Sequence, residues 1–213
     1  MRIAVLVSGS GTNLQAILDA ARAGCLEAEV ALVVSNKANA MALTRAHEAH
    51  VPSLVVSHKD YATREAYDAA LVSALREHGV ELVVLAGFMR IVTPVLLAAF
   101  PNRVLNIHPS LLPAFPGLDA QRQAFEAGVA VTGCTVHLVD GGMDTGPIVA
   151  QTAVVVRGDD DEATLRARIL VEEHRLLPRV IQWFARGLVT IDHGRGVPRV
   201  VVAGQARGSF GEP

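Results

Sequence analysis

The chain has 213 residues, of which 51% are hydrophobic and 19% charged, and this composition excludes wholesale disorder. A chain of this length can bury about 70% of its unfolded surface, so one sizeable core is expected. Nineteen basic and 21 acidic residues leave a net charge of -2, which provides no broad positive field for nucleic acid or an anionic membrane. We therefore expect the partner to be a small molecule.

The cysteines and the N-terminal sequence indicate a cytoplasmic protein. Cys25 and Cys134 are too few for a disulfide framework or a four-cysteine metal site, and their scarcity fits a reducing compartment. The apolar run that starts the chain ends before Gly9, so it is too short for a signal peptide or a membrane span. His47 and His50 have helical spacing, but nothing nearby completes a metal site, so no metal is expected.

Apolar runs and helical segments alternate through the first half of the chain. The runs are short and fully apolar, as strands buried on both faces should be. They lie at 3–8, 30–35, 54–57, 81–86 and 103–107. Segments with helical spacing lie between them, at about 13–24, 39–49, 62–78 and 94–100. This alternation predicts an α/β fold with a mostly parallel, Rossmann-like sheet and helices on both of its faces.

The pattern changes from residue 132 onward. Two strand-like runs, 132–139 and 148–156, are joined by a turn-rich segment and therefore predict an antiparallel pair. A long helix is expected from about 162 to 186, and Pro178 should kink or divide it.

Residues 194–213 contain glycine and arginine with little periodicity, and we expect a partly ordered C-terminal tail there. No repeat or linker divides the residues before this tail. The sequence therefore predicts a single domain over 1–193, in which an antiparallel C-terminal extension follows the parallel sheet.

A glycine-rich loop, Ser8–Asn13, separates the first predicted strand from the first helix. Glycines let the backbone approach an anion, and the N–H groups at a helix start point toward it. The loop therefore predicts a monophosphate site. A dinucleotide site is disfavoured, because Leu14 replaces the third glycine of that motif and no acidic residue follows the second strand. One alternative stays open, namely that the glycines only form a turn beneath a capping Thr12 or Asn13.

Asn106 and His108 lie at the end of the last predicted parallel strand. They are two positions apart, so in an extended segment their side chains lie on one side and an amide converges with an imidazole. Pro109 and Pro113 stiffen the loop that follows. Preorganised donors of this kind suit the oxyanion of an acyl transfer. The alternative is that His108 is only a structural hydrogen bonder at a strand end.

A carboxylate near His108 would keep the imidazole protonated for this role. Asp144 is our first choice, because it lies in a loop rich in glycines that cannot be there for packing. Asp140 is the competing choice, and the sequence ranks the two only weakly. For both, an ordinary Asx turn is the alternative.

These residues resemble the phosphoribosylglycinamide formyltransferases, also called glycinamide ribonucleotide transformylases, over about residues 2–192. The most specific segments are Ser8–Gln15, Leu85–Ile91, Asn106–Pro113 and Met143–Pro147. The third of these segments is shared with other 10-formyltetrahydrofolate enzymes, so it indicates the chemistry better than the acceptor. Relatives that carry an additional domain are disfavoured by the length of the chain.

The resemblance implies an enzyme of de novo purine biosynthesis that transfers a formyl group from 10-formyltetrahydrofolate to glycinamide ribonucleotide. The substrate amine would attack directly, with a stabilised tetrahedral intermediate and without a metal. The resemblance makes Asn106, His108 and Asp144 catalytic. It assigns substrate binding to Gly11, Thr12, Asn13 and Glu173. It assigns folate binding to Arg64, Met89, Arg90, Ile91, Val92, Asp140 and Gly141. The protein would be a monomer or a homodimer.

Other interpretations of the same residues stay open. Met89 is also typical of a core, and Arg64 and Glu173 are typical of solvated helix positions. The segment Leu118–Gln121 and Gly141 depart from the usual pattern of the family, and the details of the pocket depend on them. A different formyl acceptor and a non-catalytic module that binds the same sugar phosphate are the competing functions.

Overall fold

The computed structural model describes residues 1–194 and 198–211. These residues form two compact units, Met1–Asn106 and Ile107–Pro213, called unit 1 and unit 2 below. The single domain over 1–193 stays a prediction. Among the helices of the described residues, none is both long and apolar enough to span a membrane.

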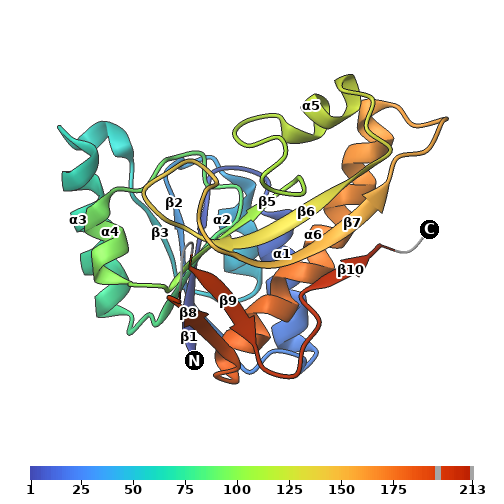
Figure 1. Cartoon of the computed structure of the whole chain (residues 1–213). Coiled ribbons are helices and arrows are strands. Elements are labelled where there is room, and N and C mark those ends of the chain that lie inside the picture. The colour runs from blue at the N-terminus through green and yellow to red at the C-terminus, as the bar shows by residue number, and fades with distance from the viewer. Residues whose placement is uncertain (195–197, 212–213) are drawn as a thin grey trace. The chain divides into compact units, whose positions relative to one another are not determined.

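Unit 1 is built on parallel strands in the order β3-β2-β1-β4-β5 (Figure 1). The strands are β1 Arg2–Val7, β2 Glu29–Ser35, β3 Ser53–Val55, β4 Leu82–Leu85 and β5 Val104–His108. The last of them begins in unit 1 and ends in unit 2. All the predicted parallel strands are therefore confirmed, with small shifts of their ends.

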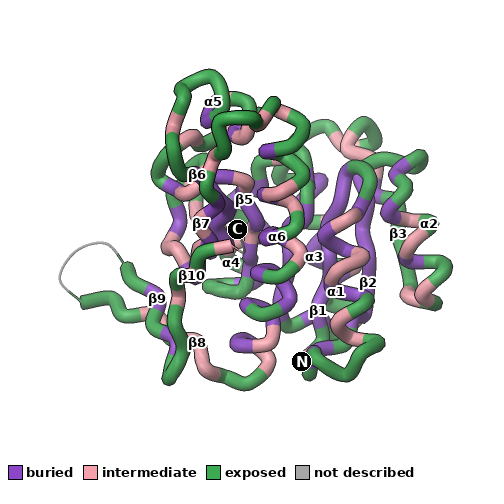
Figure 2. Tube along the Cα trace, turned by 90° about the vertical axis from the view of Figure 1, so that its right-hand side faces the viewer, coloured by how far each residue is buried: buried purple, intermediate pink, exposed green. Residues whose placement is uncertain are grey.

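Helices connect these strands and cover both faces of the sheet in unit 1. They are α1 Thr12–Arg22, α2 Met41–Glu48, α3 Arg64–Glu77 and α4 Pro94–Ala99, with a short 3-10 turn η1 at His58–Asp60. Figures 1 and 2 show α1 and α2 on one face and α3 and α4 on the other. Thr63 starts α3 as a side-chain cap, because its hydroxyl accepts a hydrogen bond from the Ala66 N–H. The predicted arrangement of helices on both faces is confirmed.

The core of unit 1 is aliphatic, as the composition predicts. Ile3–Val7 of β1 are fully buried, and Figure 2 shows β1 and β2 buried along most of their length. Leu14 and Ile17 of α1 pack into the same core without exposure. Each Å² of apolar surface buried in this way contributes roughly 25 cal/mol to stability. Because helices cover both faces, the strands are continuous apolar runs without polar alternation.

Unit 2 contains an antiparallel pair, β6 Val131–Leu138 and β7 Ile148–Val155, which confirms the predicted antiparallel extension. The long helix α6, Glu162–Ala185, packs on both strands. It starts with a capping box in which Asp161 and Thr164 each bond the other's backbone N–H. A further helix, α5 at Ala120–Glu126, is too short to give a periodic sequence pattern and is missed by the sequence analysis.

Pro178 lies inside α6, and the helix continues past it as one element. Of the two predicted effects of this residue, division of the helix is wrong, and a kink stays a prediction. A proline in a helix interior costs about 3 kcal/mol, because it removes one hydrogen bond and crowds the preceding turn. Leu177, Val180 and Ile181 beside it are fully buried. Burial of each such side chain contributes roughly 1.5–3 kcal/mol, so packing outweighs the lost bond.

Two segments of the predicted tail, which begins at residue 194, are paired in strands. The strands in this part of the chain are β8 Val189–Asp192, β9 Arg199–Val202 and β10 Gly208–Phe210. β8 pairs antiparallel with β9, and β10 pairs parallel with β7. Arg207 anchors β10, since its guanidinium donates to the backbone oxygens of Ile148 and Val149. Residues 195–197 and 212–213 of this tail lie outside the described residues.

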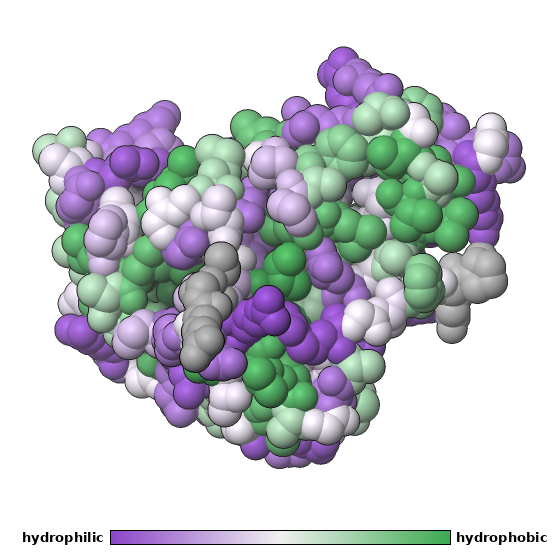
Figure 3. All heavy atoms as spheres, in the orientation of Figure 1, coloured by the Kyte–Doolittle hydropathy of each residue, from purple (hydrophilic) through white to green (hydrophobic). Residues whose placement is uncertain are grey.

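Unit 2 also exposes apolar side chains on its strands. Val131 and Val155 lie opposite each other on β6 and β7 and are 44% and 58% exposed. Figure 3 shows hydrophobic residues gathered over this end of the two strands. Beyond Val131, all residues of β6 are buried, and α6 packs on both strands.

Candidate active site

The glycine-rich loop joins β1 to α1 in unit 1. Gly11 is the residue that precedes α1, and its backbone is left-handed with φ 70° and ψ 31°. Two reasons disfavour a side chain at this position. A left-handed backbone is strained for any residue other than glycine, and a Cβ would lie 2.6 Å from the Cβ of Ala42. Thr12 and Asn13 lie inside α1, so neither occupies the capping position. The structure therefore does not support the alternative of a capping Thr12 or Asn13, and anion binding stays a prediction.

Gly11→Ala is expected to weaken binding of a sugar phosphate about tenfold or more, because the strain of roughly 1–2 kcal/mol and the contact with Ala42 both displace the loop. The matched control is Gly24→Ala, since Gly24 has the same φ of 70° but open space around its Cβ position. Both variants should lose thermal stability, whereas only Gly11→Ala should raise the KM for the sugar phosphate. Equal KM values for the two variants would contradict the prediction.

A second loop in unit 1 follows β4 and carries predicted folate-binding residues. Met89 and Ile91 are 64% and 50% exposed, so they are not core residues, while Val92 is buried. The Met89 N–H donates to Ser8 Oγ at 2.9 Å, which ties this loop to the glycine-rich loop. The sequence analysis missed this role of Ser8, although its position directly after β1 is the available signal. Exposed apolar side chains beside backbone groups are typical of a site for a flat ring with polar edges, and folate binding here stays a prediction.

Two arginines predicted to bind folate lie in the same unit. The guanidinium of Arg90 lies 4.8 Å from the ring centroid of Tyr67, in cation–π geometry. Burial raises the pKa of Tyr67 to about 12, although the charge of Arg90 opposes that shift. Arg64 is exposed at the first position of α3. Its guanidinium is therefore accessible to a carboxylate, and its role stays a prediction.

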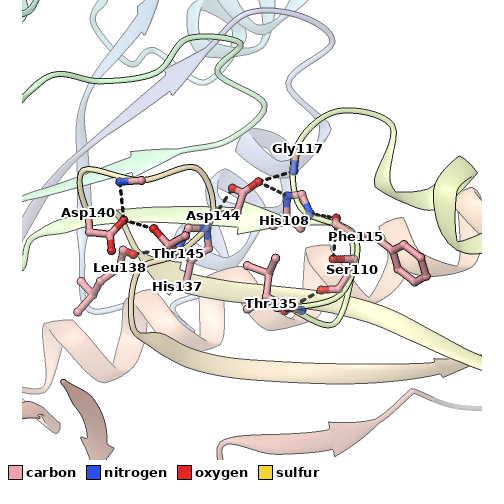
Figure 4. Close-up of polar contacts among 12 residues, drawn as sticks. His108, Ser110, Phe115, Gly117, Thr135, His137, Leu138, Asp140, Asp144 and Thr145 are labelled. Atoms are coloured by element: carbon pink, nitrogen blue, oxygen red, sulfur yellow. Dashed lines mark hydrogen bonds and ion pairs between the residues drawn. The ribbon is translucent and has the colours of Figure 1, made fainter. Parts of the chain in front are cut away.

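His108 ends β5 and is buried, with 4% exposure. Its Nε2 lies 2.8 Å from the Phe115 carbonyl oxygen, and its Nδ1 lies 3.4 Å from Asp144 Oδ2 (Figure 4). A carbonyl oxygen can only accept, so Nε2 carries a proton. The second nitrogen faces a carboxylate, so the doubly protonated ring can donate on both sides. Asn106 precedes His108 by two positions on β5, so the two side chains lie on one face of the strand, and Asn106 is partly exposed.

The loop after His108 is held by side chains of β6 and β7. Thr135 Oγ1 donates to the Ser110 carbonyl oxygen at 2.7 Å and accepts from the Leu112 N–H at 3.1 Å. Gln151 Nε2 donates to Thr135 Oγ1 at 3.0 Å. The sequence analysis attributed the stiffness of this loop to its prolines and missed Thr135 and Gln151. Their hydrogen bonds connect strands that are distant in the sequence, so no local pattern reveals them.

Asp144 lies between two histidines in unit 2. Its Oδ2 accepts from the Gly117 N–H at 2.8 Å, and its Oδ1 lies 3.6 Å from His137 Nε2 (Figure 4). Burial raises the pKa of the Asp144 carboxyl, but His137, the Gly117 N–H and the charge of His108 together lower it below its ordinary value. Asp144 is therefore an anion that faces both imidazole rings. His137 was not assigned to the site from the sequence.

The lowered pKa of Asp144 makes part of the stability depend on pH. A carboxyl whose pKa is lower in the folded protein stabilises it above the unfolded value of 3.8, and this contribution is lost as the pH falls through the folded value. We expect the difference in unfolding free energy between wild type and Asp144→Asn to shrink as the pH falls from about 6 to about 3. Urea unfolding across this range measures it, and a constant difference would contradict the prediction.

Asp140 and Asp144 have different partners, although they share a loop. Asp140 Oδ1 accepts from the Gly142 N–H at 3.0 Å and from Thr145 Oγ1 at 2.7 Å, so Asp140 stabilises the turn. Only Asp144 of these two is paired with His108. The catalytic role of Asp144 and the folate-binding roles of Asp140 and Gly141, which is exposed, stay predictions.

Glu173 lies in α6 and is buried, with 6% exposure, so it is not an ordinary solvated helix residue. Burial raises the pKa of the Cys134 thiol, and the charges of Glu173 and Glu172 raise it further. Cys134 is thus a packed thiol, and Glu173 is a buried charged group on the same side of unit 2. Its contact with the substrate stays a prediction. Within the described ranges, no cluster of three or more His, Cys, Asp or Glu side chains could hold a metal.

Comparisons with known proteins identify the family. Residues 1–181 match the formyl transferase family. The chain belongs to this family. It is 50% identical over 192 residues to the trifunctional purine biosynthetic protein adenosine-3 of Drosophila melanogaster, which covers 89% of this chain. It is 46% identical over 181 residues to the phosphoribosylglycinamide formyltransferase of Bacillus subtilis, which covers 85% of this chain and 93% of that protein.

A solved structure of a related protein has the same fold as this formyl transferase. The crystal structure of glycinamide ribonucleotide transformylase 1 from Symbiobacterium toebii matches with a TM-score of 0.91 and 55% identity, over 95% of this chain and 93% of that one. The resemblance and the fold class inferred from the sequence are therefore confirmed. The chain spans only 14% of the length of the Drosophila relative.

Proposed function

We propose that this formyl transferase is a phosphoribosylglycinamide formyltransferase, which transfers the formyl group of 10-formyltetrahydrofolate to the amine of glycinamide ribonucleotide in de novo purine biosynthesis. The observation that carries the proposal is the 3.4 Å pair between Asp144 and the buried His108, which ends the strand that also carries Asn106. Membership of the formyl transferase family and 46% identity to the Bacillus subtilis enzyme support it.

In this proposal the pair of His108 and Asp144 stabilises charge while the substrate amine bonds to the formyl carbon. The bond from that carbon to N10 of the folate then breaks, and the proton that the amine loses passes to N10. A formyl carbon attacked by an amine develops negative charge on its oxygen, which preorganised donors stabilise. The Asn106 amide supplies one such donor, and His108, whose two ring nitrogens face Phe115 and Asp144, contributes the positive charge of its imidazolium. Asp144 places a negative charge beside Nδ1 and, together with the Phe115 carbonyl at the other ring nitrogen, orients the imidazole. No covalent bond to the protein is needed, which agrees with the packed thiol of Cys134.

The proposed binding residues form two groups, one for the acceptor and one for the folate. The backbone at Gly11, Thr12 and Asn13 binds the phosphate of the acceptor, and the buried carboxylate of Glu173 binds its polar groups. The folate supplies the formyl group. Its ring system fits the exposed apolar Met89 and Ile91, and Arg64 pairs with its carboxylate. The remaining folate contacts in this proposal are Arg90, Val92, Asp140 and Gly141.

The proposal also covers the cellular compartment, the binding partners and the oligomeric state of the protein. We expect a cytoplasmic protein, since Cys25 and Cys134 are both free thiols. A net charge of -2 supports a role without nucleic acid or membrane. The protein acts as a monomer or a homodimer.

The test uses purified protein with glycinamide ribonucleotide and 10-formyl-dideazafolate, followed by the absorbance change on deformylation. Release of the deformylated folate only when the ribonucleotide is present supports the proposal. A panel of other amines tests the competing acceptors, and faster transfer to one of them would replace the proposed substrate. Binding of the ribonucleotide without formyl transfer would indicate a non-catalytic module instead.

A further inference from the structure

The start of α2 holds the glycine-rich loop from behind, within unit 1. The Ala42 N–H donates to the Gly9 carbonyl oxygen at 3.2 Å. Arg45 Nε donates to the Ser10 carbonyl oxygen at 2.8 Å. A second donor of the same guanidinium, Nη1, reaches Gln15 Oε1 on α1 at 3.0 Å. Two successive peptide units of the loop are thus fixed by α2, and Arg45 also links the loop to the helix that follows it.

These bonds set the direction of the loop amides. In a trans peptide the carbonyl of one residue and the N–H of the next point in opposite directions. Because the carbonyls of Gly9 and Ser10 point toward α2, the N–H groups of Ser10 and Gly11 point away from it. The Gly11 carbonyl accepts from the Gln15 N–H at 2.9 Å inside α1, so the Thr12 N–H points out of the helix start. A left-handed residue followed by a right-handed one forms the backbone concavity that binds anions.

We propose that Arg45 is a positioning residue of the sugar-phosphate site, which fixes the Ser10–Gly11 peptide so that the Gly11 N–H faces the phosphate. The identity of the anion rests on the proposed function. A guanidinium suits this role, because its planar fork bonds the loop carbonyl and the Gln15 amide together. A lysine keeps the charge, but its three donors share one nitrogen and lack the planar fork, so it reproduces the two bonds poorly.

The experiment compares Arg45→Met, Arg45→Lys and the control Arg76→Met, which removes the same charge from an exposed position of α3. The readouts are the two KM values and kcat of formyl transfer, and the competitive inhibition and thermal shift caused by inorganic phosphate. For Arg45→Met we expect the KM for glycinamide ribonucleotide and the inhibition constant of phosphate to rise together by about tenfold. The KM for the folate and kcat should change by less than about twofold, and Arg45→Lys should recover part of the loss.

Other outcomes overturn the inference. Wild-type phosphate inhibition in Arg45→Met would show that Arg45 does not position the loop. Full recovery in Arg45→Lys would assign its effect to charge alone, and a parallel change in kcat and both KM values would assign it to general structure. An absent phosphate shift in the wild type would remove the anion site itself. Phosphate binding without formyl transfer would instead refute the proposed function and leave the role of Arg45 to be decided by the thermal shifts.

Discussion

Asp144→Asn is expected to lower turnover about 100- to 1,000-fold while the protein stays folded. Asparagine has the same shape and retains an oxygen that can accept from the Gly117 N–H, which now donates at 2.8 Å. What it removes is the negative charge 3.4 Å from His108 Nδ1, so the ion pair with the imidazole is lost. Single-turnover kinetics with both substrates saturating measures the chemical step directly.

The control for this substitution is Asp159→Asn, which removes the same charge from an exposed position of unit 2. It should retain turnover, and circular dichroism with thermal unfolding should show that both proteins are folded. A rate near that of the wild type for Asp144→Asn would remove Asp144 from the mechanism.

A double-mutant cycle separates the pair from two independent residues. His108→Ala should reduce turnover by a similar factor, because it removes the donor that Asp144 supports. If the two act as one unit, the double variant should be little worse than either single variant. If the rate losses of the two single variants instead multiply in the double variant, Asp144 acts independently of His108. His137, whose Nε2 lies 3.6 Å from the other oxygen of Asp144, would then become the partner to test.

The parallel part of the fold could be predicted because its strands are buried on both faces. Ile3–Val7 is a continuous apolar run for that reason, and such runs are visible without tertiary information. The short strands β9 and β10 could not be predicted in the same way. β10 is only Gly208–Phe210, and it is a strand because it pairs with β7 and because Arg207 bonds the backbone there. The intrinsic β-strand propensity of three residues has little influence on whether so short a segment forms a strand.

The candidate site could be predicted where the chemistry is local to the sequence. Gly11 before a helix and His108 at a strand end are examples, since their neighbours in the chain define their surroundings. The choice between Asp140 and Asp144 could not be made, because both lie in one glycine-rich turn. Asp144 has a left-handed φ of 56°, and its carboxylate reaches the Gly117 N–H. Such a contact between distant segments depends on the folded backbone and not on residue spacing.

Gly146→Ala is expected to lower turnover about 100-fold, although Gly146 bears no functional group, because it supports the loop that carries Asp144. A Cβ on Gly146 would lie 1.8 Å from the Leu138 carbonyl oxygen, which is far closer than any real contact. The Leu138 N–H also bonds the Pro147 carbonyl at 2.9 Å, so the base of the loop is fixed on both sides of this contact. The added methyl therefore has to displace the loop.

Asp144 is two residues from Gly146, so this displacement changes its distances to His108 and Gly117. A shift of about 1 Å at a reacting group can cost on the order of 100-fold in rate. The control is Gly158→Ala in the turn before α6, where a Cβ meets nothing within 4 Å. Thermal unfolding should show a loss of stability for Gly146→Ala alone, and rates are compared at a temperature where both variants are folded.

The decisive comparison adds Asp144→Asn to Gly146→Ala. If the methyl acts by displacing Asp144, its effect on turnover should nearly vanish once the carboxylate is already replaced, because the distance that it changes no longer matters for the rate. Its effect on stability should persist in both backgrounds, since the contact with Leu138 is unchanged. An undiminished tenfold or larger loss of rate in the double variant would show that the loop contributes to catalysis through a group other than Asp144.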